Sequence, residues 1–233
     1  MHPTDVTPEL IARETDRLLA TASGLSDAAV RAPSLCDGWT RGHVLTHVAR
    51  NADGLVRVCR AITAGTDETM YAAGDARDAE IEAGQGRSAA ELAEDVRASA
   101  GTLAPWLDQL RAEHVGRTAP RTPGGPGVPA ERVRYMRLRE LVYHHVDLDA
   151  GFSFDEVDGR LVALFLEETV ANLRRHPAPP GLRLTSEEGD SYVVGDGSSE
   201  VGGTRAGLLA WLARGQTHHV HSDGELPPVP AGV

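Results

Sequence analysis

Four long stretches of the sequence repeat apolar residues at the spacing of an α-helix, and this periodicity restricts the possible folds most strongly. The stretches are residues 7–22, 39–64, 88–112 and 130–150. Two of them begin with helix-capping signals, since Thr7 precedes Pro8 and Ser88 stands three residues before Glu91. Helices with one apolar face bury those faces against one another. The sequence therefore predicts a four-helix bundle within residues 1–151.

The segments between these helices are rich in glycine, proline and charged residues. Residues 65–86 are expected to connect two helices over the surface, with a short helical possibility in DARDAEIEA, residues 75–83. The stretch RTAPRTPGGPGVPAE, residues 117–131, is predicted to be a loop. Pro105 is expected to kink the third helix, because proline removes one hydrogen-bond donor and crowds the preceding turn. Gly151 is expected to end the fourth helix.

A different pattern follows residue 151. A helical stretch carries apolar residues from Leu161 to Leu173, and the helix-breaking segment HPAPPG follows it. Residues 181–196, GLRLTSEEGDSYVVGD, are typical of two short strands joined by a polar turn, and GGTRAGLLAWLARG returns to helix. The predicted fold class is α+β: a helical bundle (1–151) with a smaller C-terminal α/β domain (152–233) packed against it.

Composition and charge exclude several classes of protein. The chain has 233 residues, 41% of them apolar, which is enough to bury a substantial core. A formal net charge of −11 opposes binding to a phosphate backbone, so nucleic acid is not an expected partner. We expect a cytoplasmic protein without a membrane partner, because MHPTDVTPEL is no targeting leader and no stretch approaches the roughly 20 apolar residues of a membrane span. Cys36 and Cys59 are too few for a disulfide framework and are expected to be buried thiols.

The pair Glu140 and His144 in RLRELVYHHVDL is the most informative polar feature. Residues four apart project from one face of a helix, so both side chains can bind one ion, and His47 on an earlier helix would complete the set. Three ligands of this kind leave a fourth position open, as in catalytic zinc sites. His43 and His47 are also four apart, so a His43/His47 pair with Glu140 or His144 is an alternative that spacing does not exclude. Such ligands accept Ni²⁺, Co²⁺ or Fe²⁺ as well as Zn²⁺.

Other polar residues have structural interpretations beside functional ones. His145 points about 100° away from His144 and is expected at an interface or on the surface. Asp147 follows His144 by three residues and is expected either to accept a hydrogen bond from its ring or to form an ordinary ion pair. The tract HHVH, residues 218–221, is expected in a solvated loop rather than at a metal. The sequence contains neither a phosphate-binding glycine loop followed by lysine nor a serine-hydrolase elbow.

Several segments, in order, resemble the mycothiol-dependent maleylpyruvate isomerases: CDGWTRGHVLTHVARNA, ETMYAAGDARDAEIEAG, MRLRELVYHHVDL and the closing GGTRAGLLAWLARG with GELPPVP. The first segment and E-x-x-x-H are shared widely among DinB-like metal-binding bundles, whereas MYAAGDARDAEIEAG is more discriminating. The resemblance implies a DinB-like four-helix bundle with a smaller C-terminal α/β domain. It places the zinc ligands on His47, Glu140 and His144, and the catalytic arginine on Arg77. His43 belongs to the family pattern too but is not a ligand there.

The resemblance also implies a reaction, the cis–trans isomerisation of maleylpyruvate to fumarylpyruvate in the gentisate pathway of aromatic degradation. Zinc and mycothiol are the implied cofactors: a zinc-activated thiolate adds to the double bond, allows rotation and leaves again. Arg77 would hold a substrate carboxylate through its forked guanidinium. The expected partners are a small substrate and a low-molecular-weight thiol, and the acidic surface is compatible with a monomer or a homodimer.

Three alternatives stay open at this level. A mycothiol S-transferase of the same superfamily would use the same bundle and ligands. A non-catalytic metal-binding bundle needs no substrate, and a metal-dependent hydrolase would activate water at the fourth position.

Overall fold

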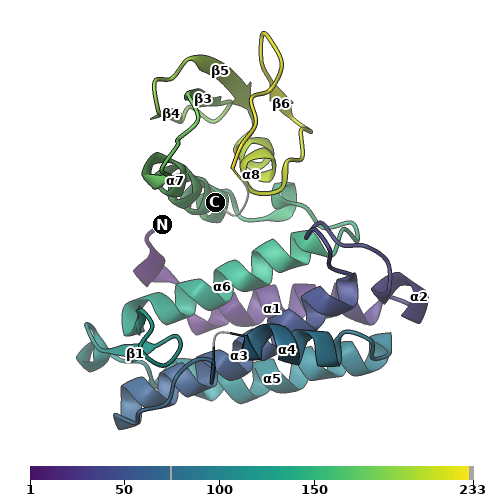
Figure 1. Ribbon diagram of the computed structural model, residues 1–233, viewed down its shortest axis with the longest axis vertical. Coiled ribbons are helices and arrows are strands. Elements are labelled where there is room, and N and C mark those ends of the chain that lie inside the picture. The colour runs from purple at the N-terminus through teal and green to yellow at the C-terminus, as the bar shows by residue number, and fades with distance from the viewer. Residues whose placement is uncertain (74, 231–233) are drawn as a thin grey trace. The chain divides into compact units, whose positions relative to one another are not determined.

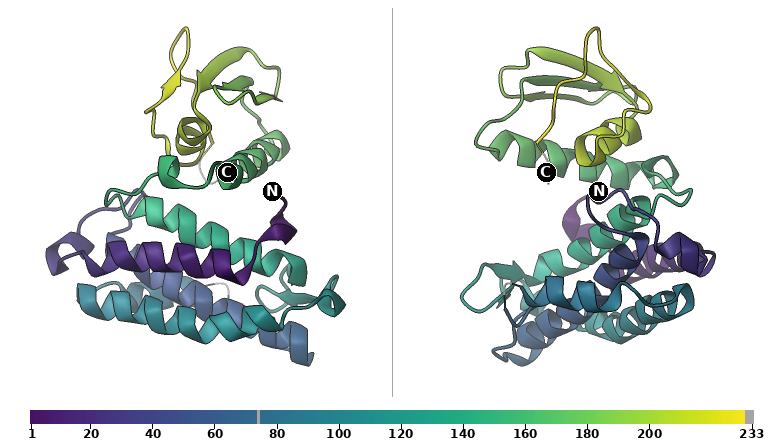
Figure 2. Two further views of the ribbon diagram at one scale, coloured as in Figure 1. Left: turned by 180° about the vertical axis from the view of Figure 1, so that it is seen from behind. Right: turned by 45° about the vertical axis from the view of Figure 1, so that its right-hand side comes forward.

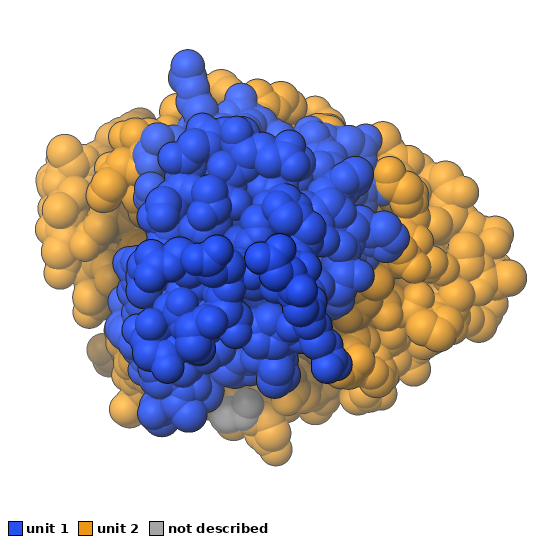
Figure 3. Space-filling view, turned by 90° about the horizontal axis from the view of Figure 1, so that it is seen from above, with its two compact units in different colours: residues 1, 152–233 blue, residues 2–151 orange. Residues whose placement is uncertain are grey.

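The computed structural model describes residues 1–73 and 75–230. The chain divides into two compact units, His2–Gly151 and Phe152–Val233 with Met1, shown in separate colours in Figure 3. Gly74, in the family-like segment, and residues 231–233, in the predicted C-terminal domain, lie outside the described residues.

The first unit contains the four long helices that the periodicity predicts. They are α1 (Pro8–Ser23), α3 (Arg41–Ala64), α5 (Ala89–Gln109) and α6 (Ala130–Asp147), and Figure 1 shows them side by side. Both α1 and α3 pack against α5 and α6. Their inward side chains, among them Leu18, Leu45, Leu92 and Leu141, are completely buried. Each such leucine contributes about 2 kcal/mol by leaving water.

Local capping signals fix where these helices begin. Thr7 caps α1, and Ser88 and Glu91 form the predicted capping box of α5. At α3 the cap is Thr40, whose hydroxyl accepts from the backbone N–H of His43. The His43 ring in turn accepts from the backbone N–H of Thr40 at 3.1 Å. The first turn of α3 is therefore held on both sides, which fixes the start of the helix that carries His47.

Short elements connect the long helices. They are the 3-10 helices η1 (Pro3–Asp5) and η2 (Ala112–His114), and the helices α2 (Asp27–Val30) and α4 (Ala76–Gly84). The short helical possibility in residues 75–83 is confirmed as α4. Pro105 lies inside α5, which continues to Gln109. The end of α6 was predicted too late, because the helix stops at Asp147, four residues before Gly151.

The prediction of a loop at residues 117–131 is wrong, because the segment forms a hairpin. Strands β1 (Thr118–Pro120) and β2 (Gly127–Pro129) pair in antiparallel fashion, and each has only three residues. Strands this short carry no periodicity that distinguishes them from a loop. The hairpin also accepts hydrogen bonds from the backbone N–H groups of Met70 and Tyr71, at 3.0 and 2.9 Å. It therefore anchors the segment that leads into α4.

The second unit is the predicted smaller α/β region. Its elements are the 3-10 helix η3 (Phe154–Glu156), helices α7 (Gly159–Arg175) and α8 (Arg205–Arg214), and strands β3 (Leu182–Ser186), β4 (Ser191–Val194), β5 (Ser199–Gly203) and β6 (Val220–His221). The strand order is β4-β3-β5-β6, with β3 and β5 parallel and the other neighbours antiparallel. Helices α7 and α8 cover one face of this sheet (Figure 2), and Leu166, Leu184 and Trp211 lie in the shared core.

The two strands predicted at residues 181–196 are confirmed as β3 and β4. Strands β5 and β6 were not predicted, because the first is rich in glycine and the second has two residues. The helix-rich architecture with small sheets confirms the α+β class. Within the described residues, no helix has both the length and the apolar character needed to cross a membrane.

Candidate metal centre

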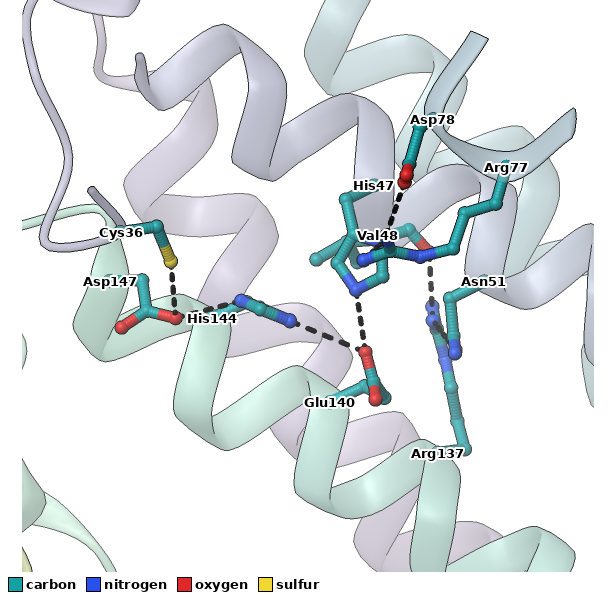
Figure 4. A network of polar contacts seen from close by, with 10 residues as sticks. All are labelled: Cys36, His47, Val48, Asn51, Arg77, Asp78, Arg137, Glu140, His144 and Asp147. Atoms are coloured by element: carbon teal, nitrogen blue, oxygen red, sulfur yellow. Dashed lines mark hydrogen bonds and ion pairs between the residues drawn. The ribbon is translucent and has the colours of Figure 1, made fainter. Parts of the chain in front are cut away.

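Helices α3 and α6 bring His47, Glu140 and His144 together, and Figure 4 shows the three side chains converging. One ligand atom of each lies within 4.8 Å of the other two. The Nε2 atoms of His47 and His144 lie 2.7 and 3.3 Å from the same oxygen, Oε2 of Glu140. His47 is almost fully buried, whereas the Glu140 side chain keeps 25% of its surface exposed. Glu140 is therefore the most exposed side chain of the cluster.

The chemistry and spacing of these three residues fit a divalent metal. Ligand atoms around a tetrahedral ion at about 2.1 Å lie roughly 3.4 Å apart, and the His144–Glu140 distance of 3.3 Å matches this spacing while the His47–Glu140 distance of 2.7 Å is shorter. Two imidazoles and one carboxylate are ligands that zinc and its neighbours in the transition series accept. Among residues 1–73 and 75–230, no fourth donor belongs to this group. The assignment of the three residues as ligands remains a prediction that this geometry supports.

Asp147 lies behind His144 and fixes the orientation of its ring. The carboxylate is completely buried, and its Oδ2 lies 2.8 Å from Nδ1 of His144. A carboxylate only accepts hydrogen bonds, so Nδ1 carries the proton and Nε2 is directed at Glu140. The contact fits both roles expected for Asp147, because it is a hydrogen bond and also an ion pair when His144 is protonated, as Figure 4 shows.

Cys36 was expected to be a buried thiol, and the structure corrects this. Its side chain is partly exposed, and Sγ donates to Oδ2 of Asp147 at 3.3 Å. Cys36, His144 and Asp147 form a second cluster of potential ligands in the described part of the chain. The polar atoms of this cluster are already hydrogen-bonded to one another. We therefore interpret Cys36 and Asp147 as the groups that support Nδ1 of His144. Cys59 is completely buried, as expected.

The surroundings give the three predicted ligands different protonation states. Burial lowers the pKa of His47 to about 4, with the neighbouring His144 acting in the same direction, so His47 is neutral near pH 7. Burial raises the pKa of Glu140, but hydrogen bonds from His144 and His47 outweigh it and hold that pKa well below its usual value. Burial lowers the pKa of His144, but hydrogen bonds with Asp147, Cys36 and Glu140 raise it well above its usual value. Metal binding at His144 would therefore release a proton.

Arg77 lies next to this cluster, at the start of α4. Its Nη2 is 3.2 Å from Nδ1 of His47, and its Nη1 donates to Asp78 at 2.6 Å. Its Nε is buried and has no hydrogen-bond partner among residues 1–73 and 75–230. The structure therefore brings the predicted catalytic arginine beside His47, which lies 30 residues away in sequence.

Helix α4 reaches this position because glycines allow close contact with its neighbours. A Cβ at Gly42 would lie 2.3 Å from the backbone oxygen of Gln85, and a Cβ at Gly84 would lie 2.6 Å from the side chain of Thr46. His43 adds a polar contact, since its Nε2 lies 3.3 Å from Oε1 of Glu82. His43 is absent from both ligand clusters and connects α3 to α4.

One tryptophan contacts the site, whereas the remaining histidines lie outside the predicted ligand set. Trp39, which was not singled out from the sequence, packs its ring against His43, His47 and Arg77. His145 is buried between α6 and α1, with Nε2 2.7 Å from the hydroxyl of Thr21. The tract at residues 218–221 contributes to neither ligand cluster among the described residues.

The comparison with known proteins identifies the family. The model of the mycothiol maleylpyruvate isomerase N-terminal domain matches residues 11–149. The chain belongs to this family. The match spans α1 through α6, including every predicted ligand and Arg77.

Solved structures of mycothiol-dependent maleylpyruvate isomerases resemble the whole chain. One is a crystal structure of the mycothiol-dependent maleylpyruvate isomerase, and another is a histidine-to-alanine mutant. Each is 27% identical in sequence, with a TM-score of 0.88 and coverage of 99% of both chains. No match was found among curated proteins. The resemblance drawn from the sequence segments is therefore confirmed at the level of family and fold.

Proposed function

We propose that this protein is a mycothiol-dependent maleylpyruvate isomerase whose centre holds a divalent metal through His47, Glu140 and His144. The main support for this proposal is the three-residue cluster, in which two imidazole nitrogens lie 2.7 and 3.3 Å from one carboxylate oxygen. Full-length similarity to solved isomerases supports the reaction, and the zinc ion, the gentisate pathway and the thiolate step are parts of the proposal. A cytoplasmic location and a monomeric or homodimeric state stay predictions of the sequence.

The metal and the thiol, when bound, would supply a thiolate that adds reversibly to the cis double bond and so permits rotation about it. The chain's own residues prepare the site for this chemistry. Asp147 keeps the proton on Nδ1 of His144, which leaves Nε2 for the metal. The low pKa values keep His47 neutral and Glu140 ionised at neutral pH, which are the charge states that a metal requires of these groups.

Arg77 is the group that we assign to the substrate. Maleylpyruvate carries a carboxylate, and a guanidinium binds a carboxylate through two parallel hydrogen bonds. Within the described part of the chain the Nε of Arg77 has no hydrogen-bond partner, so this arginine retains an unused donor. Addition of a nucleophile moves negative charge onto the conjugated carbonyl oxygen, and a nearby guanidinium also stabilises that charge.

The proposal is tested by metal content and turnover in the same preparations. The purified protein should contain about one metal ion per chain and convert maleylpyruvate only when mycothiol is present. Glu140→Ala and His144→Ala should lose the metal and the activity together, because each removes one of three ligands. Glu94→Ala, a change of an exposed carboxylate on α5, is the matched control and should retain both.

The same assay separates the alternative functions. An S-transferase would consume mycothiol in proportion to product, whereas the isomerase returns it unchanged. A non-catalytic bundle would bind metal without any thiol-dependent turnover. Activity at the wild-type level in a metal-free variant would refute the proposed centre.

A further inference from the structure

We propose that Trp39 is a positioning residue that holds the guanidinium of Arg77 beside the metal centre. The proposal rests on the proposed function in one respect, the assignment of Arg77 to the substrate carboxylate. The arrangement of Trp39 itself follows from contacts within the described residues.

The backbone of Trp39 is fixed on both sides. Its N–H donates to the carbonyl of Cys36 at 3.0 Å, and its carbonyl accepts from the backbone N–H and the hydroxyl of Ser34, both at 2.9 Å. The next residue, Thr40, is the N-cap of α3. A side chain on so constrained a turn keeps a defined direction relative to α3, which carries His47.

The indole ring of Trp39 contacts three residues of the site. It stacks on His43 with ring centroids 6.1 Å apart, and its centroid lies 5.6 Å from that of His47. The guanidinium carbon of Arg77 lies 5.6 Å from the Trp39 centroid. This distance is within the range of a cation–π contact, and tryptophan is the strongest aromatic partner for such a contact. Trp39 therefore touches both a predicted ligand and the predicted substrate-binding arginine.

The other contacts of Arg77 are poorly suited to keep it in place. Its ion pair is with the adjacent residue, Asp78, whose side chain is 70% exposed. Exposed ion pairs hold their partners weakly because water screens the charges. The contact with His47 is a single one, between Nη2 of Arg77 and Nδ1 of His47 at 3.2 Å. The indole ring lies 5.6 Å from the guanidinium carbon on a turn that is itself hydrogen-bonded, so it restricts the positions open to the guanidinium.

A double-mutant cycle between Trp39 and Arg77 tests the proposal in the full-length, metal-loaded protein. Trp39→Leu should lower kcat/KM for maleylpyruvate by about 2- to 30-fold, mainly through KM, and should keep one metal ion per chain. In an Arg77→Met background, the same change should have no further effect, because Trp39 acts through the arginine. Trp39→Phe keeps an aromatic face and should retain most of the activity, and Trp106→Leu on α5 is the matched control.

Independent, additive losses from Trp39→Leu and Arg77→Met would overturn the proposal. Loss of the metal in Trp39→Leu would also overturn it, because the indole would then support His47 rather than Arg77.

A spectroscopic measurement keeps this test separate from the proposed function. The Nε–H signal of Arg77 in a ¹H–¹⁵N spectrum, assigned by its loss in Arg77→Lys, should shift upfield through the ring current of Trp39. Trp39→Leu should remove that shift, and Trp39→Phe should retain part of it. An unchanged signal in Trp39→Leu would overturn the proposal. If the wild-type protein fails to isomerise maleylpyruvate, the proposed function fails and this spectrum still decides the role of Trp39.

Discussion

At the scale of single residues, the buried carboxylate of Asp147 supports the predicted ligand His144. Asp147 is completely buried and accepts from both the His144 ring and the Cys36 thiol. Without these hydrogen bonds the carboxylate would be a costly buried charge. The same bonds hold the ring of His144 in the tautomer that a metal requires.

Replacement of this carboxylate should weaken metal binding without unfolding the protein. We expect Asp147→Asn to lower the metal affinity by about 10- to 100-fold, because an amide no longer holds the proton on Nδ1 by charge. The affinity is measured by competition with a chelator of known strength. Asp108→Asn on α5 is the control, and Cys36→Ser, which keeps a donor to Asp147, should change the affinity much less. An unchanged affinity in Asp147→Asn would show that the carboxylate has no part in metal binding.

The two cysteines should differ in reactivity. Burial raises the pKa of the Cys59 thiol to about 12, and the reactive form of a thiol is the thiolate. Because that pKa lies far above neutral pH, Cys59 should resist alkylation at pH 7 until the protein unfolds, whereas the partly exposed Cys36 should react. Mass spectrometry should find one label on the folded chain and two in denaturant. Equal labelling of both cysteines in the folded protein would contradict the burial of Cys59.

The placement of Arg77 depends, at the scale of elements, on how α4 packs against α3. Gly42 and Gly84 allow the two segments to approach, and His43 pairs with Glu82 between them. The hairpin β1–β2 fixes the preceding residues through Met70 and Tyr71. The position of the arginine is therefore determined by packing on both sides of residue 77.

A methyl group at Gly42 should disturb this packing. We expect Gly42→Ala to lower the free energy of unfolding by about 1–3 kcal/mol, because its Cβ would lie 2.3 Å from a backbone oxygen. It should also raise KM for maleylpyruvate through a displaced Arg77. Urea unfolding and steady-state kinetics measure the two effects.

Gly101 in α5 provides the matched comparison. A Cβ there meets nothing within 4 Å, so Gly101→Ala should raise the free energy of unfolding by about 0.5–1 kcal/mol. Equal effects of the two substitutions would indicate that helix propensity, rather than the contact between α3 and α4, governs the result at Gly42.

At the scale of the whole molecule, all the residues assigned to the centre lie within the unit His2–Gly151. This unit has its own buried core, and the second unit has a separate one built from α7, α8 and the sheet. The predicted ligands and Arg77 therefore all come from this first unit, and the division into domains 1–151 and 152–233 stays a prediction.

The bundle expressed alone should fold and bind metal. We expect a fragment of residues 1–151 to show cooperative unfolding and about one metal ion per chain, because its core and ligands are complete. Elemental analysis and thermal unfolding measure both, and His47→Ala in the fragment should remove the metal. A fragment that is unfolded or metal-free would show that the bundle requires residues beyond 151.

The sequence by itself determined the four long helices, the metal-ligand candidates and the family, because helical periodicity, E-x-x-x-H spacing and capping residues are local signals. It did not separate His43 from His47 as a ligand on spacing alone, since both lie on α3 four residues apart. Only the tertiary structure favours one of them, because it directs His47 toward Glu140 and His43 toward Glu82. Likewise the links from Cys36 to Asp147 and from Trp39 to Arg77 join residues 111 and 38 positions apart. Such contacts arise from packing between distant segments, which no local pattern encodes.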